Sequence, residues 1–222
     1  MKVDEKRLVA FHEAGHALVA STSRLADPIH KVSIIPRGAG IGGYVLQRPE
    51  DDRMVMTQSR LQLAIRIALG GTIAEEIVFG EISTGALNDL KQANNVARRM
   101  VKEFGMSRLG RIFVKEGDEN SFLPSIFSDG VRDCSEDTAR EIDLEVRQII
   151  DTATDQVRDI LKRNRAALEA LAGRLVEKEV IEGSELKELL QNAGMVPEAP
   201  IVPVEANGTT EAHGNIPLVP GS

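Results

Sequence analysis

The stretch His12-Glu13-Ala14-Gly15-His16 places two histidines four residues apart within a segment that favours a helix. Residues 3–21 contain no proline, begin with alternating charges and then become apolar. Four residues are about one helical turn, so both imidazoles lie on one face and can bind one divalent ion. This stretch therefore predicts a metal-binding helix.

Glu13 is the residue that gives this helix a chemical function. It lies about 100° around the helix from His12, where it reaches a metal-bound water but is poorly aimed to bind the metal itself. Zinc with nitrogen and carboxylate ligands lowers the pKa of its water from 15.7 towards about 7. A carboxylate beside that water acts as general base and later protonates the leaving amine. We therefore predict Zn²⁺ as cofactor and Glu13 as the catalytic residue of a metallopeptidase.

A catalytic zinc has three protein ligands, and the two commonest sources of the third ligand fail here. The pattern H-E-x-x-H-x-x-G-x-x-H would need glycine and histidine at positions occupied by Val19 and Thr22. A glutamate that follows His16 closely, as in His₂Glu sites, is also absent. Asp27 is the only acidic residue between His16 and the strand-like segment 31–35.

The third ligand must therefore come from farther along the chain, where three carboxylates are candidates. Glu75 and Glu76 follow Gly70-Gly71, and Asp89 closes the segment 83–89. Spacing does not choose among them. Asp89 or its neighbour Asn88 equally fits the cap of a helix that continues to Phe104.

Five blocks with the right order and spacing resemble the peptidase domain of the FtsH family: 12–16, 31–38, 49–53, 70–76 and 83–90. The resemblance resumes at 135–139 and continues to about residue 192. It implies that His12, His16 and Asp89 are the zinc ligands. It further implies membrane-bound, ATP-dependent zinc proteases that assemble as homo-hexamers and cleave unfolded or membrane-extracted proteins delivered by an AAA+ ATPase module. The parent protein would act at the cytoplasmic side of a bacterial inner membrane or its organelle equivalent.

Two further roles are expected, the first from this resemblance and the second from the usual chemistry of metal sites. The glycine-rich segment Ile41-Gly42-Gly43-Tyr44 would border the zinc cleft and bind substrate by main-chain hydrogen bonds, although it also fits an ordinary glycine-rich turn. Glu75 would orient a histidine ring from the second coordination shell, or is simply a charged residue near a helix end.

The expected fold class is α+β and predominantly helical. A zincin-like helix and a small sheet at about 30–46 would be followed by a C-terminal helical bundle. We divide the chain into a zinc-binding catalytic part, a helical part and a disordered tail, at 1–134, 135–194 and 195–222. We also predict a helix after Thr57 that breaks near Gly70-Gly71, a loop at 115–134, a long helix starting at Ser135 and a helix at about 161–176.

Composition excludes other classes of function. A net charge of −7 without a basic cluster, with six Phe and one Tyr, gives no support for nucleic-acid binding. The single cysteine, Cys134, excludes an internal disulfide. We find no apolar run of membrane-spanning length and no phosphate-binding G-x-x-x-x-G-K-[ST] loop, so membrane attachment and ATP hydrolysis would belong to other parts of a longer protein.

Two alternatives from another class remain. One is a helical interaction domain with no metal. In the other, the helical part makes subunit contacts around a purely structural zinc, which would give a non-catalytic assembly module. Such a site has four protein ligands and needs no base, so Glu13 argues against it.

Overall fold

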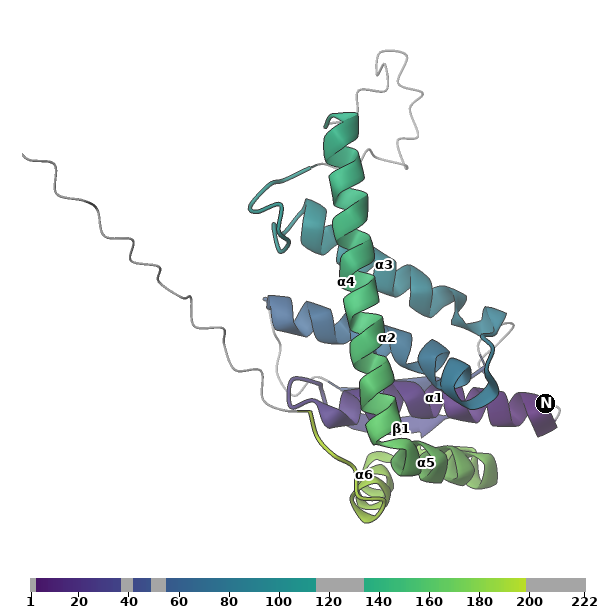
Figure 1. Cartoon of the computed structure of the whole chain (residues 1–222). Coiled ribbons are helices and arrows are strands. Elements are labelled where there is room, and N and C mark those ends of the chain that lie inside the picture. Colours follow the sequence, from purple (N-terminus) through teal and green to yellow (C-terminus); the bar gives the residue numbers. More distant parts are fainter. Residues whose placement is uncertain (1–2, 37–41, 49–54, 115–133, 199–222) are drawn as a thin grey trace, which may run out of the picture.

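The structure, a computed structural model, describes residues 3–36, 42–48, 55–114 and 134–198 (Figure 1). Within these residues, helices dominate and three short strands form one sheet, which confirms the predicted α+β, mainly helical class. In chain order the elements are α1 (Val3–Thr22), β1 (Ile29–Ser33), β2 (Tyr44–Gln47), α2 (Gln58–Phe79), η1 (Thr84–Ala86), α3 (Leu87–Lys102), α4 (Glu136–Arg163), α5 (Arg165–Lys178), β3 (Val180–Glu182) and α6 (Gly183–Asn192).

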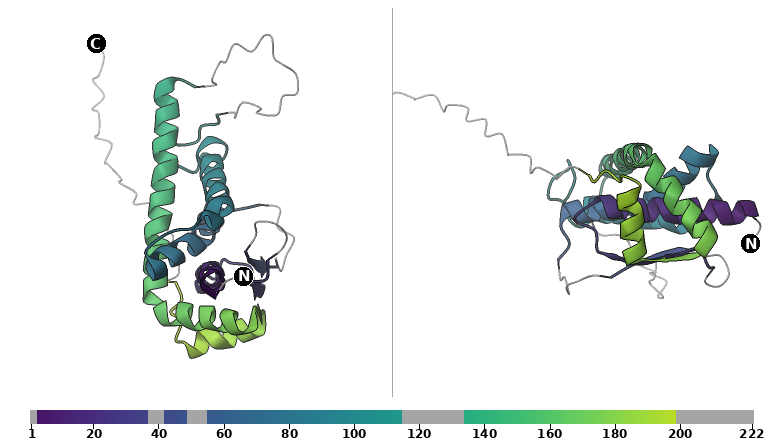
Figure 2. Two further views of the ribbon diagram at one scale, coloured as in Figure 1. Left: turned by 90° about the vertical axis from the view of Figure 1, so that its right-hand side faces the viewer. Right: turned by 90° about the horizontal axis from the view of Figure 1, so that it is seen from below.

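Helix α1 lies at the centre of the fold. Every residue from Ala10 to Ala20 is buried, because α2, the sheet and α5 all pack against this helix. Seen along its axis in Figure 2, α1 is enclosed by these elements. Ala10, Ala14 and Ala17 are fully buried, and their small side chains let neighbouring backbones approach closely. The histidine pair is thus carried on a helix that its surroundings hold in place.

Helix α2 is continuous from Gln58 to Phe79, so the predicted break at Gly70-Gly71 is wrong. These glycines lie where α2 crosses α1. A Cβ atom on Gly15 would be only 2.3 Å from the carbonyl oxygen of Gly70. Glycine within a helix costs about 1 kcal/mol relative to alanine, and here close helix packing offsets that cost. The helix instead ends at Gly80, whose φ of 75° suits a left-handed C-cap.

The sheet has the order β2-β1-β3, and both pairs are antiparallel. Strand β1 is central, and its Val32 pairs with Val45 of β2 and Ile181 of β3. The predicted range of about 30–46 captured β1 and most of β2 but not β3. Strand β3 has three residues between α5 and α6, which is too short to show an alternating pattern.

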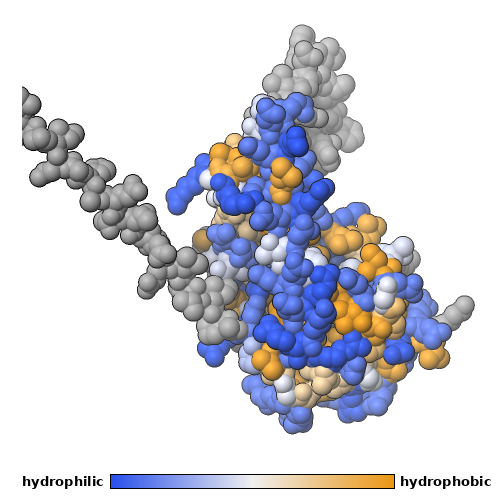
Figure 3. Space-filling model, in the orientation of Figure 1, coloured by the Kyte–Doolittle hydropathy of each residue, from blue (hydrophilic) through white to orange (hydrophobic). Residues whose placement is uncertain are grey.

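Helix α4 begins where the sequence predicted, because the Ser135 side chain accepts a hydrogen bond from the backbone N–H of Thr138. It crosses α2 and α3 (Figure 1), and the surface along its outer side is mainly hydrophilic (Figure 3). The helix predicted at about 161–176 is observed as α5, which starts at Arg165 after a junction at Asn164.

The predicted catalytic and helical parts share one buried core, since α4 packs on α2, α5 packs on α1 and β3 pairs with β1. Among the described residues, no helix is long and apolar enough to span a membrane. The predicted loop falls almost entirely outside the described residues, as does the tail beyond residue 198. The start of that tail is described: Val196 is hydrogen-bonded to Asn164, and the backbone N–H of Glu198 to the carbonyl of Thr22.

Candidate metal centre and catalytic cleft

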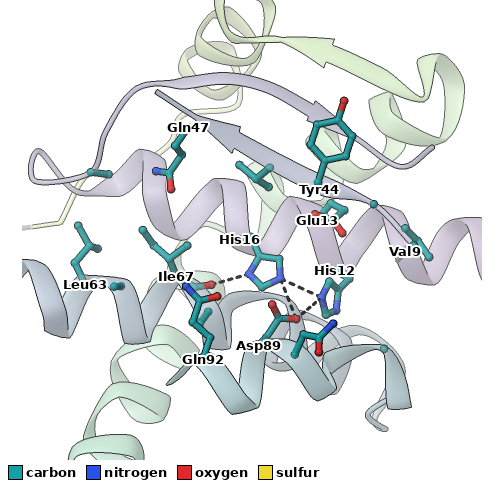
Figure 4. A pocket seen from close by; sticks show the side chains of 18 of the residues that line it. Val9, His12, Glu13, His16, Tyr44, Gln47, Leu63, Ile67, Asp89 and Gln92 are labelled. Carbon is teal, nitrogen blue, oxygen red and sulfur yellow. Dashed lines mark hydrogen bonds and ion pairs between the residues drawn. The ribbon is translucent and has the colours of Figure 1, made fainter. Parts of the chain in front are cut away.

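His12 and His16 face one another on buried turns of α1, with their ring centroids 4.7 Å apart. The two Nε2 atoms are 3.0 Å apart and point to a common centre (Figure 4). The third group at this centre is Asp89, whose Oδ2 lies 3.1 Å from Nε2 of His12 and 3.6 Å from Nε2 of His16. The structure therefore brings together three residues that are up to 77 positions apart in the sequence.

Asp89 does not cap helix α3. The N-cap position is occupied by Ala86, which makes no side-chain cap hydrogen bond, and Asp89 lies within the first turn. Its carboxylate is directed at the two imidazoles instead (Figure 4). The helix start thus places the carboxylate at the centre without using it to satisfy backbone amides.

The outer nitrogens of both rings are occupied by hydrogen-bond acceptors. Nδ1 of His16 lies 2.6 Å from the carbonyl oxygen of Ile67, and Nδ1 of His12 lies 2.6 Å from Oε1 of Glu75. A carbonyl or carboxylate oxygen can only accept, so each Nδ1 carries the hydrogen. In the neutral rings both Nε2 atoms then present lone pairs to the centre, next to the oxygen of Asp89. Three acceptor atoms this close repel one another unless a positive charge lies between them.

The pKa shifts of His12 and Asp89 also favour a positive charge at the centre. Burial alone would lower the pKa of His12, but hydrogen bonds to Asp89 and Glu75 raise it to about 9. Burial would raise the pKa of Asp89, but its hydrogen bonds to His12 and His16 lower it below its usual range. The centre therefore stabilises a cation, whether a proton or a metal ion.

The distances fit zinc. Two ligand atoms at about 2.05 Å from a tetrahedral zinc ion are about 3.3 Å apart, and the three observed separations are 3.0, 3.1 and 3.6 Å. The donor set of two neutral imidazoles and one carboxylate also suits Zn²⁺. Within the described part of the chain, these three residues are the one group of His, Cys, Asp or Glu placed to hold a metal ion.

Glu75 and Glu76, the other candidate ligands, are in different environments. Glu75 is fully buried and contacts the outer side of His12, away from the centre. Burial would raise its pKa, but hydrogen bonds from His12 and Ser83 lower it, so it is held as a carboxylate. Glu76 is exposed and pairs with Arg158 of α4.

Glu13 is buried on α1 beside the two histidines, on the side of the helix that faces β2 (Figure 4). Burial raises the pKa of its carboxyl, while the charges of His16 and His12 oppose that shift. Gly43 packs closely on it, since a Cβ at that position would be 2.7 Å from Oε1 of Glu13. A glutamate with a raised pKa next to a cation site is suited to accept and return a proton.

A cleft of about 440 Å³ opens over the metal centre. The cleft is lined on the sheet side by Gly42, Gly43 and Tyr44. On the side of α3 it is lined by Asn88 and Gln92. The Tyr44 hydroxyl points away from the histidines (Figure 4). Ile41, the fourth residue expected in this segment, lies outside the described residues.

Three features of the site escaped sequence analysis. The Ile67 carbonyl carries no side-chain signal at all. The sequence marks Ser83 only as the start of its block, yet Ser83 donates twice to Glu75. The sequence predicts a helix break at Gly71, yet this residue forms the floor of the centre, because a Cβ there would be 2.6 Å from both Nε2 atoms. A glycine pair inside an otherwise helical pattern was the available signal for close packing.

An H-E-x-x-H helix whose imidazoles meet a carboxylate from another helix beneath an open cleft is the arrangement of H-E-x-x-H metallopeptidases. Comparison with known proteins agrees. The sequence model of Peptidase family M41 matches residues 1–189, and the chain belongs to this family.

Curated relatives carry a similar sequence within longer chains. An ATP-dependent zinc metalloprotease FtsH of Pirellula staleyi is 53% identical over 199 residues, which is 89% of this chain and 28% of the relative. One of Syntrophobacter fumaroxidans is 48% identical over 86% of this chain and 30% of the relative. FtsH 4 of Synechocystis is 47% identical over 84% and 30%. The chain thus spans less than a third of the relatives it matches.

Proposed function

We propose that this chain is the zinc endopeptidase part of an FtsH-type protease, with His12, His16 and Asp89 as metal ligands and Glu13 as general base and acid. The convergence of two Nε2 atoms and one carboxylate oxygen within 3.0–3.6 Å carries this proposal. Zinc bound there would make water nucleophilic at neutral pH and polarise the scissile carbonyl.

Glu13 would move the protons of the reaction. Its carboxylate takes a proton from the attacking water and then delivers it to the nitrogen of the departing amine. The raised pKa that burial gives this carboxyl supports the second step, because a protonated Glu13 is less costly in a buried position. General catalysis of this kind is worth about 10² to 10⁴ in rate.

The remaining side chains would hold the ligands in place. The Glu75 carboxylate and the Ile67 carbonyl fix the ring orientation of His12 and His16 and keep hydrogen on each Nδ1. In metal sites such partners also raise the basicity of the ligating nitrogen. Glu75 therefore acts on the metal through His12.

Substrate would bind as an extended strand beside β2. In the described part of the chain, β2 lies at the edge of the sheet, where it pairs with β1. Gly42 and Gly43 give the backbone of a substrate close access to the cleft. Main-chain pairing supplies affinity with little demand on side chains, which suits unfolded or membrane-extracted polypeptides as substrates. The segment Ile41-Gly42-Gly43-Tyr44 would be the binding edge.

The names of the relatives support a larger assembly for the parent protein. They describe ATP-dependent zinc metalloproteases, so we propose that an AAA+ ATPase module feeds this domain. We further propose that the domains assemble as a homo-hexamer at the cytoplasmic side of a membrane, with attachment through segments outside this chain.

A non-catalytic assembly module is less well supported. A structural zinc site is closed by four protein ligands, whereas three candidate ligands from the described residues converge here and a cleft opens over them. A structural site needs no general base, so it does not explain the carboxylate of Glu13 beside that cleft.

The test pairs Glu13→Gln with Glu76→Gln, an exposed glutamate in the same protein. Glu13→Gln should keep one zinc per chain but lose cleavage of unfolded casein by the assembled, ATP-supplied parent protein. Glu76→Gln should keep both. Undiminished cleavage by Glu13→Gln would show that Glu13 is not the general base. Absence of zinc from the wild-type protein would contradict the proposed zinc endopeptidase.

A further inference from the structure

Ser83 lies in the connection between α2 and η1 and binds both oxygens of the Glu75 carboxylate. Its backbone N–H donates to Oε2 at 2.6 Å, and its hydroxyl donates to Oε1 at 3.1 Å. Oε1 is the same oxygen that lies 2.6 Å from Nδ1 of His12. Ser83 thus fixes the carboxylate that orients the first histidine.

This carboxylate depends on its donors because Glu75 is fully buried. A buried carboxylate that loses a hydrogen bond leaves its oxygen unsatisfied, so it shifts towards another donor. Such a shift moves the acceptor that His12 meets. Ser83 is therefore in a position to control the ring of His12 without touching it.

The same hydroxyl also organises the segment that leads to Asp89. Ser83 is the N-cap of η1, and its Oγ accepts a hydrogen bond from the backbone N–H of Gly85 at 3.2 Å. A hydroxyl has one hydrogen and two lone pairs, so it can donate to Glu75 and accept from Gly85 together. Helix η1 runs directly into α3, which carries Asp89 in its first turn.

We propose that Ser83 is a positioning residue that couples His12 to Asp89 and assembles the metal centre before metal arrives. The Ser83 side chain contacts both the carboxylate that orients His12 and the segment that leads to Asp89. The inference rests on the proposed zinc site, but it predicts properties of the metal-free chain as well.

The test compares Ser83→Ala and Ser83→Gly, which delete the hydroxyl, with Ser83→Thr, which restores it. Ser107→Ala is the matched control. Ser107 accepts a hydrogen bond from the backbone N–H of Leu109 at 3.2 Å, in the same two-residue turn outside the metal centre. All variants are made in the 222-residue chain, and zinc affinity is measured by competition with a chelator.

Ser83→Ala and Ser83→Gly should bind zinc about 10- to 100-fold more weakly than wild type, the usual effect of losing an outer-shell partner. Both should also shift the visible spectrum of the cobalt-substituted chain. Ser83→Thr and Ser107→Ala should match wild type in both measurements. In the metal-free chain, amide hydrogen exchange at residues 83–89 should be faster in the deletion variants only.

Unchanged zinc affinity, cobalt spectrum and amide exchange in a folded deletion variant would overturn the role of Ser83 and leave the zinc site intact. A wild-type chain that binds neither metal would contradict the proposed function instead. Ser83→Gly keeps the backbone donor and tolerates the observed φ of −100°, so it provides the same deletion should Ser83→Ala fail to fold.

Discussion

Replacing Gly71 with alanine would place a methyl group against both metal-binding nitrogens. The added Cβ would lie 2.6 Å from Nε2 of His12 and 2.6 Å from Nε2 of His16. Ordinary van der Waals contact begins near 3.4 Å, so the ligands and the new methyl would have to separate by about 0.8 Å.

Moving the helices apart to supply that space would break the close packing of α1 on α2. Gly15 and Gly70, the residues next to His16 and Gly71, bring the two backbones into contact there. Zinc sites tolerate ligand displacements of only about 0.2 Å, so the rings must give way. We expect Gly71→Ala to lower zinc affinity by at least about 100-fold.

Gly173→Ala is the matched control. Gly173 is also a helix-interior glycine, in α5, but a Cβ at that position meets nothing within 4 Å. Alanine there should stabilise the chain by about 1 kcal/mol and raise its melting temperature by about 2–4 °C. The same helix-propensity gain applies at Gly71, so any loss at that position comes from the metal centre.

Both variants should be tested for zinc affinity by chelator competition and for helix content by circular dichroism. The expected result is a folded Gly71→Ala chain that releases zinc and a Gly173→Ala chain that binds it normally. Wild-type zinc affinity in Gly71→Ala would refute the position of the ligands described here.

Three further predictions concern the ligands and the fold. Asp89→Ala should weaken zinc retention more than Glu75→Ala, and the reverse order in dialysis against a chelator would transfer the ligand role to Glu75. In the metal-free chain the pKa of His12 is about 9 instead of 6.5. Its interactions therefore stabilise the fold fully below about pH 6.5 and are lost as pH rises through about 9. Urea unfolding should show stability falling across that window, and a flat profile would contradict it. Asn164→Ala removes the buried amide that bonds the backbone of Val196. It should cost about 1–3 kcal/mol in the free energy of unfolding, and a urea midpoint equal to that of wild type would show that this contact is unimportant.

The sequence predicted the elements whose signals are local. The H-E-x-x-H spacing predicted α1 with its paired histidines, and Ser135 marked the start of α4 because a cap is a contact between near neighbours. The choice of Asp89 over Glu75 and Glu76 came from a family resemblance. Spacing alone could not show which carboxylate meets a helix more than 60 residues away.

The sequence failed where tertiary packing outweighs local preference. Gly70 and Gly71 favour a helix break in isolation, but contact with α1 and with the imidazoles makes glycine the residue that fits there. Strand β3 forms because β1 offers a partner, and the Ile67 carbonyl is a backbone group that any residue supplies. These are properties of the assembled core.

The most direct measurement is a crystal structure of the zinc-loaded 222-residue chain with anomalous data at the zinc edge. We expect one ion bound by Nε2 of His12, Nε2 of His16 and Oδ2 of Asp89, with a water in the remaining position towards Glu13. An ion closed by four protein ligands, or one bound elsewhere in the chain, would contradict this expectation.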